Sequence, residues 1–520
     1  MSKYMNRLTA SILSVLLVIA IMAPVLSAQA FNKELSEVNT FAGDSYENYI
    51  DGQLSEARFS NPTNFASLAN GDIVIADSGN HAIRIISKGQ VSTLTGAPFI
   101  ISGELALQGS FLDGKGTEAA FNSPAGLIVA KDGSIYVADT ENHAIRKVST
   151  DGTVVTIAGN GEHGLEDGKG TEAKFYSPSD VAIDSKGNIY VADTLNHAIR
   201  KISVNGNVTT LNKPSERLVE YTPGAIDVVG SYADGPLSEA LFNEPTALLI
   251  DSADNLYVSD RGNQRIRYID FSTDIVSTVA GSGELHKDEL YVEGGYLDGT
   301  ASTAQFFSPE GMTWLDEQTI LIADRKNHTV RQLKNGIVST LTGVAEEYGN
   351  VNGIALSALL NEPSDILVQE DGSILILEAG NNQLRKLAHY TNFMSVTFSN
   401  EPEVVVNGKL LPTKAEMKDS RTLLPLRAIG TELNLTVHYD EKTKQITLSN
   451  STTKFEFKTN ENQVIKTEAG VTTPYKLDSP ATNINNVTYI PLRFISEQLN
   501  LNVAWDAQLK NVVIRDYIFN

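Results

Sequence analysis

Four histidines recur at one place in a repeated hairpin: His81, His143, His197 and His328. Imidazole is a common metal ligand, so a ring of these side chains could hold a transition metal. Two other copies of the hairpin carry Gln264 and Asn382 at this place. Glutamine is a poor ligand for such metals, but it shares with histidine the ability to hydrogen-bond backbone groups. We therefore interpret the histidines as structural turn residues.

Every copy of the hairpin also pairs an acidic residue with an arginine seven positions later. A carboxylate at the end of a strand can form a charge-assisted bond with an arginine of the same hairpin and so orient the turn. Because the pair is present in all six copies, it indicates scaffold rather than a single active site. The pairs are Asp77 and Arg84, Asp139 and Arg146, Asp193 and Arg200, Asp260 and Arg267, Asp324 and Arg331, and Glu378 and Arg385.

Positions that differ between the copies are better candidates for function. Two residues after a repeated proline, the third copy has Asp180 and the sixth has Asp365, whereas the other copies have Asn, Gly or Ala. Glu310 lies next to the corresponding position of the fifth copy. We expect these three carboxylates at one mouth of a central channel, where a cation or a polar ligand could bind. The alternative is that the carboxylates are simply solvated.

The hairpin belongs to a unit that occurs six times, with the acidic residues 54 to 67 positions apart. In the second unit, short strands are expected at residues 125–130, 134–138, 144–148 and 154–158, separated by Asp-Gly turns. Four antiparallel strands repeated at this period predict a six-bladed β-propeller. The sixth unit lacks an outer strand, and a matching strand stands alone at residues 38–43. We expect that strand to complete the last blade and close the ring.

The sequence Asn-His-Ala-Ile-Arg at residues 142–146, after a strand that ends in an acidic residue, resembles the NHL repeat. Residues 31–390 as a whole resemble a six-bladed NHL propeller. The resemblance implies the fold but leaves the function open, because NHL propellers include protein- and RNA-binding modules and relatives of amidating lyases. Long loops at residues 97–111, 211–232 and 282–296 favour partner binding on one face.

Composition and the first residues limit the expected partners and indicate where the protein is located. The chain has 520 residues and a formal net charge of −22, so nucleic acid is not an expected partner. It has no cysteine, which excludes disulfides and thiolate metal sites. Residues 1–30 combine Lys3 and Arg7 with an apolar run and an Ala-Gln-Ala site, which is typical of a secretory signal peptide; the alternative is an uncleaved membrane anchor. No later stretch is long enough for a transmembrane span.

A different pattern begins after the propeller. Residues 422–440 align without gaps on residues 488–506, an offset of 66. In each copy a proline, Pro425 or Pro491, opens a short helix that strands follow. The pattern predicts a small duplicated α+β domain at residues 395–520, with halves at about 395–450 and 451–520.

The Pro-Leu-Arg helix followed by Val-x-(Tyr/Trp)-Asp resembles the copper amine oxidase N-terminal-like domain. That module is common in exported proteins of Gram-positive, spore-forming bacteria. Amine oxidation needs three copper-binding histidines and a quinone-forming tyrosine motif, whereas this module has His438 alone and no such motif. We therefore expect no copper, no other cofactor and no amine oxidase activity. The resemblance implies an accessory domain for attachment at the cell surface, in which Arg427 and Arg493 are either structural or contact an anionic wall polymer.

Together these features predict a secreted, non-enzymatic binding or scaffold protein associated with the cell wall. Its propeller would recognise a protein or a glycan, and its C-terminal domain would associate with the envelope. One alternative is a metal-assisted lyase or hydrolase with its site at the propeller channel. Another is purely structural packing in a surface layer or spore coat.

Overall fold

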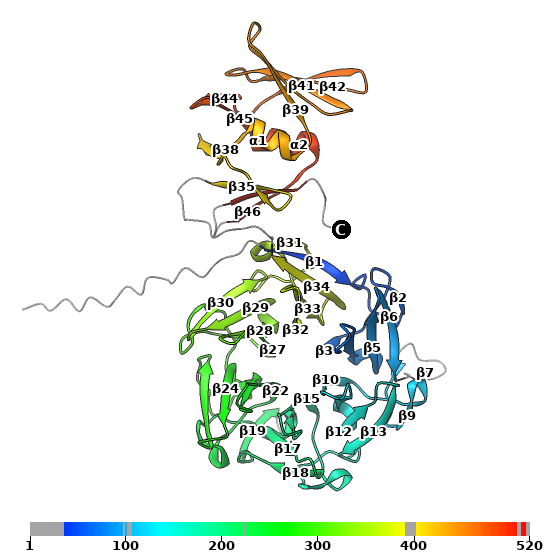
Figure 1. Ribbon diagram of the computed structural model, residues 1–520. Coiled ribbons are helices and arrows are strands. Elements are labelled where there is room, and N and C mark those ends of the chain that lie inside the picture. The colour runs from blue at the N-terminus through cyan, green and yellow to red at the C-terminus, as the bar shows by residue number, and fades with distance from the viewer. Residues whose placement is uncertain are drawn as a thin grey trace, which may run out of the picture.

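The computed structural model describes residues 36–96, 99–100, 107–222, 224–389, 402–506 and 511–515. The expected signal peptide and the join between the two domains lie outside these residues. Residues 36–389 form a ring of six antiparallel sheets, and residues 402–515 form a separate domain beyond the rim of the ring (Figure 1). The chain is therefore mainly β, with a six-bladed propeller followed by a small α+β domain.

Each blade has four main strands, counted from the axis outward. The innermost strands all begin at the repeated proline: β3 (Pro62–Ser67), β10 (Pro124–Val129), β15 (Pro178–Ile183), β22 (Pro245–Ile250), β27 (Pro309–Asp316) and β32 (Pro363–Val368). The second strands all end at the acidic residue of the hairpin: β4 (Ile73–Asp77), β11 (Ile135–Asp139), β16 (Ile189–Asp193), β23 (Leu256–Asp260), β28 (Thr319–Asp324) and β33 (Ile374–Glu378).

The third strands all contain the repeated arginine: β5 (Ala82–Ser87), β12 (Ala144–Val148), β17 (Ala198–Ile202), β24 (Arg265–Asp270), β29 (Thr329–Lys334) and β34 (Gln383–His389). The fourth strands of blades one to five are β6 (Gln90–Thr95), β13 (Thr153–Ala158), β18 (Asn207–Thr210), β25 (Ile275–Ala280) and β30 (Ile337–Thr342). In blade six this place is taken by β1 (Ser36–Ala42), which pairs with β34. The N-terminal strand thus joins the two ends of the ring.

Each sheet has a fifth, two-residue strand that the sequence did not suggest. These strands begin at the Gly of the Asp-Gly series, or at its counterpart in blade six, and pair with the fourth strand: β2 (Gly52–Gln53), β9 (Gly114–Lys115), β14 (Gly168–Lys169), β21 (Gly235–Pro236), β26 (Gly299–Thr300) and β31 (Gly353–Ile354). They cover the outer edge of each blade, which would otherwise offer unpaired backbone groups. Two hairpins extend the interblade loops: β7 (Phe99–Ile100) with β8 (Leu107–Gln108), and β19 (Arg217–Thr222) with β20 (Ala225–Val229).

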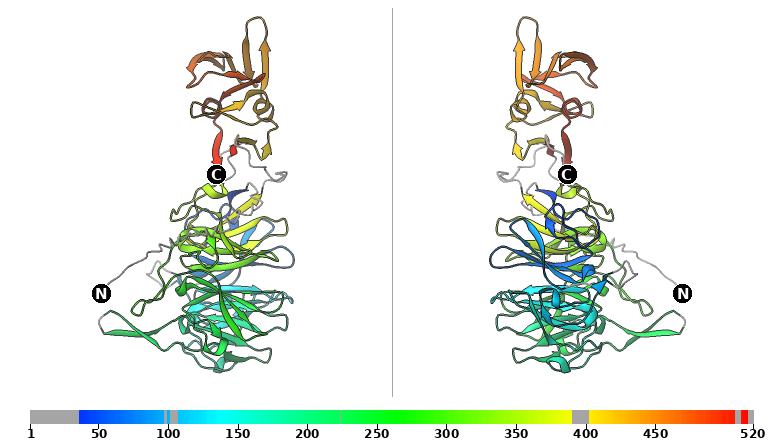
Figure 2. Two further views of the ribbon diagram at one scale, coloured as in Figure 1. Left: turned by 90° about the vertical axis from the view of Figure 1, so that its left-hand side faces the viewer. Right: turned by 90° about the vertical axis from the view of Figure 1, so that its right-hand side faces the viewer.

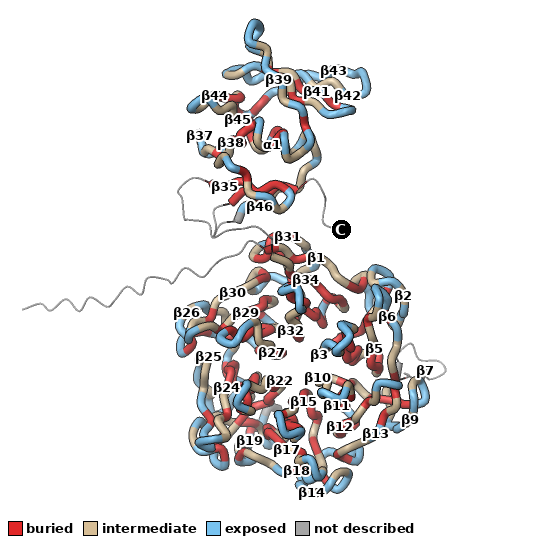
Figure 3. The backbone as a smooth tube through the Cα atoms, in the orientation of Figure 1, coloured by how far each residue is buried: buried red, intermediate tan, exposed pale blue. Residues whose placement is uncertain are grey.

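Apolar side chains fill all six interfaces between neighbouring blades. Buried residues accordingly occur in the strands of every blade (Figure 3). The repeated phenylalanines of blades one to five (Phe59, Phe121, Phe175, Phe242 and Phe306) are fully buried at the interfaces, and Leu360 takes this place in blade six. Burial of apolar area is the main stabilising term in such an assembly. Each unit thus contributes to the apolar interfaces with both of its neighbours.

A buried ion pair fixes each blade internally, and blade one shows its geometry. Asp77 Oδ2 accepts from Arg84 Nη1 at 2.6 Å and from Asn80 Nδ2 at 2.8 Å, while its Oδ1 accepts from Ser60 N at 2.8 Å. The Arg84 guanidinium also donates to Asp51 Oδ1 at 2.6 Å. Both Asp77 and Arg84 are completely buried. The pair therefore ties the second strand, the third strand and the interblade segment together.

The C-terminal domain packs three sheets and two helices around one apolar core. The helices are α1 (Leu426–Glu432) and α2 (Leu492–Leu499). The first sheet contains β35 (Glu403–Val406), β36 (Lys409–Leu410), β46 (Asn502–Asp506) and β47 (Asn511–Arg515). The second contains β37 (Glu416–Lys418), β38 (Arg421–Pro425), β44 (Thr482–Ile484) and β45 (Val487–Pro491). The third is a meander of β39 (Thr436–Asp440), β40 (Gln445–Ser449), β41 (Thr453–Lys458), β42 (Gln463–Glu468) and β43 (Val471–Lys476).

The duplication seen in the sequence is a symmetric pairing in space. Strands β38 and β45 are antiparallel, and Leu424 pairs with Ile490. These two residues are equivalent under the 66-residue offset. Leu423 faces Pro491 and Pro425 faces Tyr489, so the pairing is unchanged when the halves are exchanged. The two halves thus meet around a local twofold axis and share one core.

The C-terminal domain touches the propeller at the closing strand (Figure 2). Ile354 of β31 packs with Val405 and Val513 of the C-terminal domain in one buried cluster. Beside it, Arg515 Nε donates to Glu37 Oε2 of β1 at 2.9 Å. The Arg515 side chain is fully buried and that of Glu37 is 13% exposed. The last described strand therefore holds the strand that closes the ring.

We expect Arg515→Ala to lower the free energy of unfolding by about 3 kcal/mol, because it leaves the carboxylate of Glu37 buried without this cation. Urea denaturation of the full chain, followed by tryptophan fluorescence, measures the change. Arg493→Ala is the control, since the Arg493–Glu497 pair is 75% and 60% exposed and such pairs contribute well under about 1 kcal/mol. Equal effects of the two substitutions would show that the interdomain pair does not stabilise the closure.

Candidate functional site

One face of the propeller carries the turns between the second and third strands. They are the 3-10 turns η1 (Ser78–Asn80), η3 (Thr140–Asn142), η5 (Thr194–Asn196), η7 (Arg261–Asn263) and η8 (Arg325–Asn327), with residues 379–382 in blade six. In every blade an asparagine of this turn donates to a carbonyl of the preceding interblade loop, as Asn80 does to Asn48 O at 2.9 Å. The interblade loops therefore share this face, which we call the turn face.

The histidines of the turns link neighbouring blades. Each Nδ1 accepts a hydrogen bond from a backbone N–H just before the repeated proline of the next blade, at 2.9 to 3.2 Å. Gln264 and Asn382 make the same link with their side-chain oxygens, at 2.6 and 2.7 Å. Burial lowers the pKa of His143, His197 and His328, so their ring nitrogens remain acceptors at neutral pH. The six side chains form a ring of interblade bonds around the disc.

Asp180 and Asp365 form a second, inner set of interblade bonds. Asp180 Oδ2 accepts from Leu248 N at 2.8 Å, and Asp365 Oδ2 accepts from Phe65 N at 3.2 Å. Asn64 of blade one makes the same kind of bond to Leu127 N at 3.1 Å. The preceding blade has glycine beside each aspartate, because a Cβ at Gly126 or Gly311 would lie 2.2 Å from the Oδ1 of Asp180 or Asp365. The aspartates thus fill space that the glycines leave open.

Burial makes these two aspartates weak acids. Asp180 is 6% exposed and Asp365 is 5% exposed. Desolvation raises the pKa of Asp180 to about 7, although two backbone N–H groups oppose the rise. Desolvation also raises the pKa of Asp365 well above its usual value, and the charges of Asp180 and Glu310 add to that rise. Their bonding partners in the described chain are backbone amides.

Glu310 is held by arginine. Its two carboxylate oxygens accept from Arg325 Nη1 at 3.0 and 3.1 Å, and Arg261 Nη1 lies 3.8 Å from it. Within the residues that the structure describes, no group of three or more His, Asp or Glu side chains is placed to hold a metal ion. The three carboxylates expected at the channel mouth therefore have separate partners, and Glu310 belongs to a larger cluster.

That cluster is a line of alternating charges on the turn face of blades four to six. Arg261 pairs with Glu244, and Arg325 donates to Glu362 at 2.9 and 3.0 Å as well as to Glu310. Lys326 also pairs with Glu362. We call these six residues the charged arc: Glu244, Arg261, Glu310, Arg325, Lys326 and Glu362.

The charges of the arc stabilise one another, so the arc is a preorganised polar surface. The charge of Glu310 raises the pKa of Arg325 despite the opposing effect of burial, and Glu362 adds to the rise. Burial acts to raise the pKa of Glu362, but Lys326 and Arg325 hold it below its usual value. Side chains of the arc remain 9 to 44% exposed. Solvated edges of the arc can therefore contact a ligand.

The sequence contained a signal for the arc that our site prediction did not use. The residue after the repeated acidic residue is Ser, Thr and Thr in blades one to three, but Arg261 and Arg325 in blades four and five. The residue before the repeated proline is Glu244 in blade four and Glu362 in blade six, and Asn or Ser elsewhere. Comparison of these two positions across the six repeats distinguishes the blades with charged residues there from the blades with small, polar residues.

Exposed aromatic side chains surround the arc. Tyr291 is 44% exposed and its hydroxyl donates to Glu244 Oε1 at 2.8 Å. Burial, with this hydrogen bond, raises the pKa of Tyr291 to about 12. Tyr348 is 72% exposed and lies beside His328, with ring centroids 5.6 Å apart, while Phe307 is 42% exposed. The charged half of the turn face thus combines fixed charges with aromatic surface.

The two arginines singled out in the C-terminal domain lie near the starts of its helices. Arg427 is exposed on α1. Arg493 on α2 is 75% exposed and its Nε donates to Glu497 Oε1 at 3.1 Å. Arg493 also lines a groove of about 640 Å³ with Arg421. Both residues are therefore accessible to a large ligand.

No helix among the described residues is long and apolar enough to cross a membrane.

Comparison with known families agrees with the two-part architecture. The NHL repeat model matches residues 59–86, 121–148 and 175–202, which are equivalent parts of blades one to three. The copper amine oxidase N-terminal domain model matches residues 405–514. The chain thus carries NHL repeats followed by a domain similar to the N-terminal domain of copper amine oxidases.

Similar proteins match about two thirds of the chain. The chain is 28% identical over 352 residues to NHL repeat-containing protein 2 of Gallus gallus, covering 64% of this chain and 46% of that protein. It is 28% identical over 384 residues to NHL repeat-containing protein 2 of Homo sapiens, covering 68% and 51%. The chain therefore spans about half the length of these relatives. A solved structure of an auxiliary nutrient binding protein from Bacteroides ovatus aligns with 18% identity and a TM-score of 0.49, over 68% of this chain and 77% of that one.

Asp180→Asn tests the inner interblade bonds through their pH dependence. Because the pKa of Asp180 is about 7 in the folded chain against 3.8 for the free group, its stabilising contribution is present at low pH and is lost as the pH rises from about 4 to about 7. Asparagine keeps an acceptor for Leu248 N, as Asn64 does in blade one. At pH 8 we expect the free energy of unfolding of Asp180→Asn to exceed that of the parent chain by on the order of 2–4 kcal/mol. The variant should therefore be the more stable of the two at this pH.

Urea denaturation from pH 4 to pH 8 measures this difference. Asp132→Asn is the control, because it removes the same charge from a side chain that is 62% exposed. A parent chain whose stability rises between pH 4 and pH 7 relative to Asp180→Asn would contradict the raised pKa.

Proposed function

We propose that the chain is a secreted, non-enzymatic binding protein of the cell envelope. In this proposal the turn face of the propeller holds a protein or glycan ligand, and the C-terminal domain associates with wall polymer. The observation that carries the proposal is the charged arc. It breaks the sixfold pattern on one face, whereas the residues common to all blades make bonds within and between blades.

Several features of the turn face support ligand binding. Aromatic rings with a polar edge, such as those of Tyr291 and Tyr348, are enriched in recognition surfaces because they supply contact area at little entropic cost. The arc adds hydrogen-bond donors and acceptors in fixed positions, with three acidic and three basic residues. A ligand with hydroxyl, amide or mixed charged groups matches such a surface better than a highly charged one.

Support for envelope association comes from the C-terminal domain and the first residues. The match to the copper amine oxidase N-terminal domain, without the residues for copper chemistry, favours an accessory role. Arg427 and Arg493 are exposed cations on a chain whose net charge is −22, and Glu497 pairs with Arg493. Anionic wall polymers would contact these arginines in preference to the acidic remainder of the surface. The signal-like residues 1–30 favour export.

Association with the wall is tested by pelleting the mature chain with isolated Gram-positive cell walls. We expect the parent chain to pellet, and Arg427→Glu together with Arg493→Glu to weaken the association about tenfold, because the substitutions place negative charge against an anionic polymer. Val204→Ser is the control, since Val204 is 65% exposed on the propeller. Pelleting that is unchanged by the arginine substitutions would remove the C-terminal domain from this role.

Recognition by the turn face is tested with soluble fragments that a muramidase releases from the same walls. We expect saturable binding to the full chain, and Tyr291→Ala with Tyr348→Ala to weaken it about tenfold through loss of aromatic contact. Val204, in the loop between β17 and β18 on the opposite face, again supplies the control. Equal binding by the tyrosine variant and the parent would show that the turn face does not recognise these glycans.

A further inference from the structure

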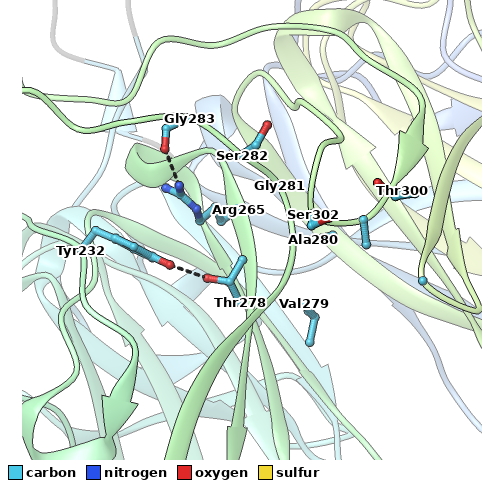
Figure 4. A pocket seen from close by; sticks show the side chains of 12 residues that line it. Tyr232, Arg265, Thr278, Val279, Ala280, Gly281, Ser282, Gly283, Thr300 and Ser302 are labelled. Carbon is cyan, nitrogen blue, oxygen red and sulfur yellow. Dashed lines mark hydrogen bonds between the residues drawn. The ribbon is translucent and has the colours of Figure 1, made fainter. Parts of the chain in front are cut away.

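A pocket between the outer parts of blades four and five lies apart from the charged arc. Its volume is about 630 Å³. It is bounded by β24, the end of β25 with the glycines that follow it, and the segment after β26 (Figure 4). We call it the rim pocket. The residues that matter for its chemistry are Tyr232, Arg265, Thr278, Ser282, Thr300 and Ser302.

Arg265 places a buried positive charge in the wall of the rim pocket. The residue is 8% exposed. Its guanidinium donates to two carbonyls, Asn263 O at 3.1 Å and Gly283 O, and lies 4.2 Å from the centre of the Tyr232 ring. No carboxylate of the described chain forms an ion pair with it. In contrast, Arg267, two residues further along β24, pairs with both Asp260 and Asp234.

The other blades show that the scaffold does not need this charge. The same register position is alanine in blades one to three (Ala82, Ala144 and Ala198), Thr329 in blade five and Gln383 in blade six. A buried cation is costly unless an anion or several hydrogen bonds compensate it. The guanidinium has five N–H groups, and two hydrogen bonds to carbonyls leave donors for another acceptor. Blade four therefore has a cation that the other blades lack, and the N–H groups that its two carbonyl partners do not use can donate to an anionic ligand in the pocket.

The rest of the pocket is lined by hydroxyl groups and glycine backbone. Tyr232 and Thr278 share a hydrogen bond of 3.0 Å (Figure 4). Ser282 Oγ donates to Ala304 O at 2.9 Å. Thr300 and Ser302 lie on the facing segment of blade five. Hydroxyl side chains both donate and accept, so they suit a hydroxylated ligand. The volume also exceeds what a single inorganic ion would occupy.

We infer that the rim pocket binds an anionic sugar, whose carboxylate or phosphate pairs with Arg265 while its hydroxyl groups contact Thr278, Ser282, Thr300 and Ser302. Three of the five N–H groups of the guanidinium are not used by Asn263 O and Gly283 O, and such charged donors bind a carboxylate or a phosphate well. Asp234 lies near the pocket, but Arg267 and the backbone N–H of Thr278 already hold its carboxylate. The inference does not depend on the proposed function of the turn face.

Calorimetric titration of the full chain tests the inference with three probes: glucuronate, glucose 6-phosphate and glucose. We expect one of the two anionic sugars to bind with one site per chain and glucose to bind at least about tenfold more weakly, because only the anions pair with Arg265. Preference for glucuronate identifies a carboxylate ligand, and preference for glucose 6-phosphate identifies a phosphate ligand. Inorganic phosphate alone should compete weakly, since it makes no hydroxyl contacts.

Two substitutions separate the charge of Arg265 from its bond to the loop. Arg265→Gln keeps a donor for Gly283 O and is the residue type of blade six, so we expect it to fold and to lose about tenfold or more in affinity. Arg265→Lys keeps the charge, and we expect it to retain binding in part. Arg421→Gln, an exposed arginine of the C-terminal domain, is the control for net charge and should bind as the parent does.

Three results would overturn the inference. The first is no saturable binding of either anionic sugar up to about 10 mM, the weak limit of specific recognition. The second is binding of glucose as strong as that of the anionic sugars. The third is anion binding that Arg265→Gln leaves unchanged. If Arg265→Gln lowers the melting temperature, Arg265→Lys still decides, because loss of binding in that folded variant also contradicts the charge pairing.

Discussion

The buried pair of acidic residue and arginine is the interaction on which the propeller depends. In each blade one carboxylate accepts from an arginine, an asparagine and a backbone N–H, so three donors offset part of the cost of its burial. The same arginine reaches the interblade segment and stacks near a buried phenylalanine, with 5.3 Å between Arg84 and the Phe59 ring. In blade six, Glu378 and Asn352 replace the two aspartates, and both still bond Arg385. The interaction with the arginine therefore tolerates these replacements.

Around this unit the blades are joined by one ring of six hydrogen bonds and by three further bonds nearer the axis. The propeller is closed by a strand from the other end of the chain. The turn residues supply the outer bonds, while Asn64, Asp180 and Asp365 supply three inner ones. The C-terminal domain also contributes to ring closure, because Arg515 pairs with Glu37 of the closing strand. Residues that repeat are therefore accounted for by structure, as are Asp180 and Asp365 among the residues that differ between blades. The charged arc is left for function.

Much of the fold followed from the sequence, because each repeat encodes a local hairpin and its turn. The 66-residue offset likewise revealed two similar halves, although only the structure shows Leu424 facing Ile490 on a local twofold axis. The site was less accessible to sequence reasoning. Glu310 meets Arg325 of its own blade, and that arginine meets Glu362 of the next. Such contacts are set by the curvature of the ring, and no periodicity along the chain reports them.

Scaffold and binding surface are carried by different residues in the proposal made above, and a symmetrised propeller tests this separation. Glu244→Ser, Arg261→Thr, Glu310→Ser, Arg325→Thr and Glu362→Ser together give blades four to six the residues that blade three has at these positions. Melting temperature and binding of soluble wall fragments would be measured on one preparation. We expect a folded ring with a melting temperature close to that of the parent and little or no binding. A ring that fails to fold, or one that binds as the parent does, would contradict it.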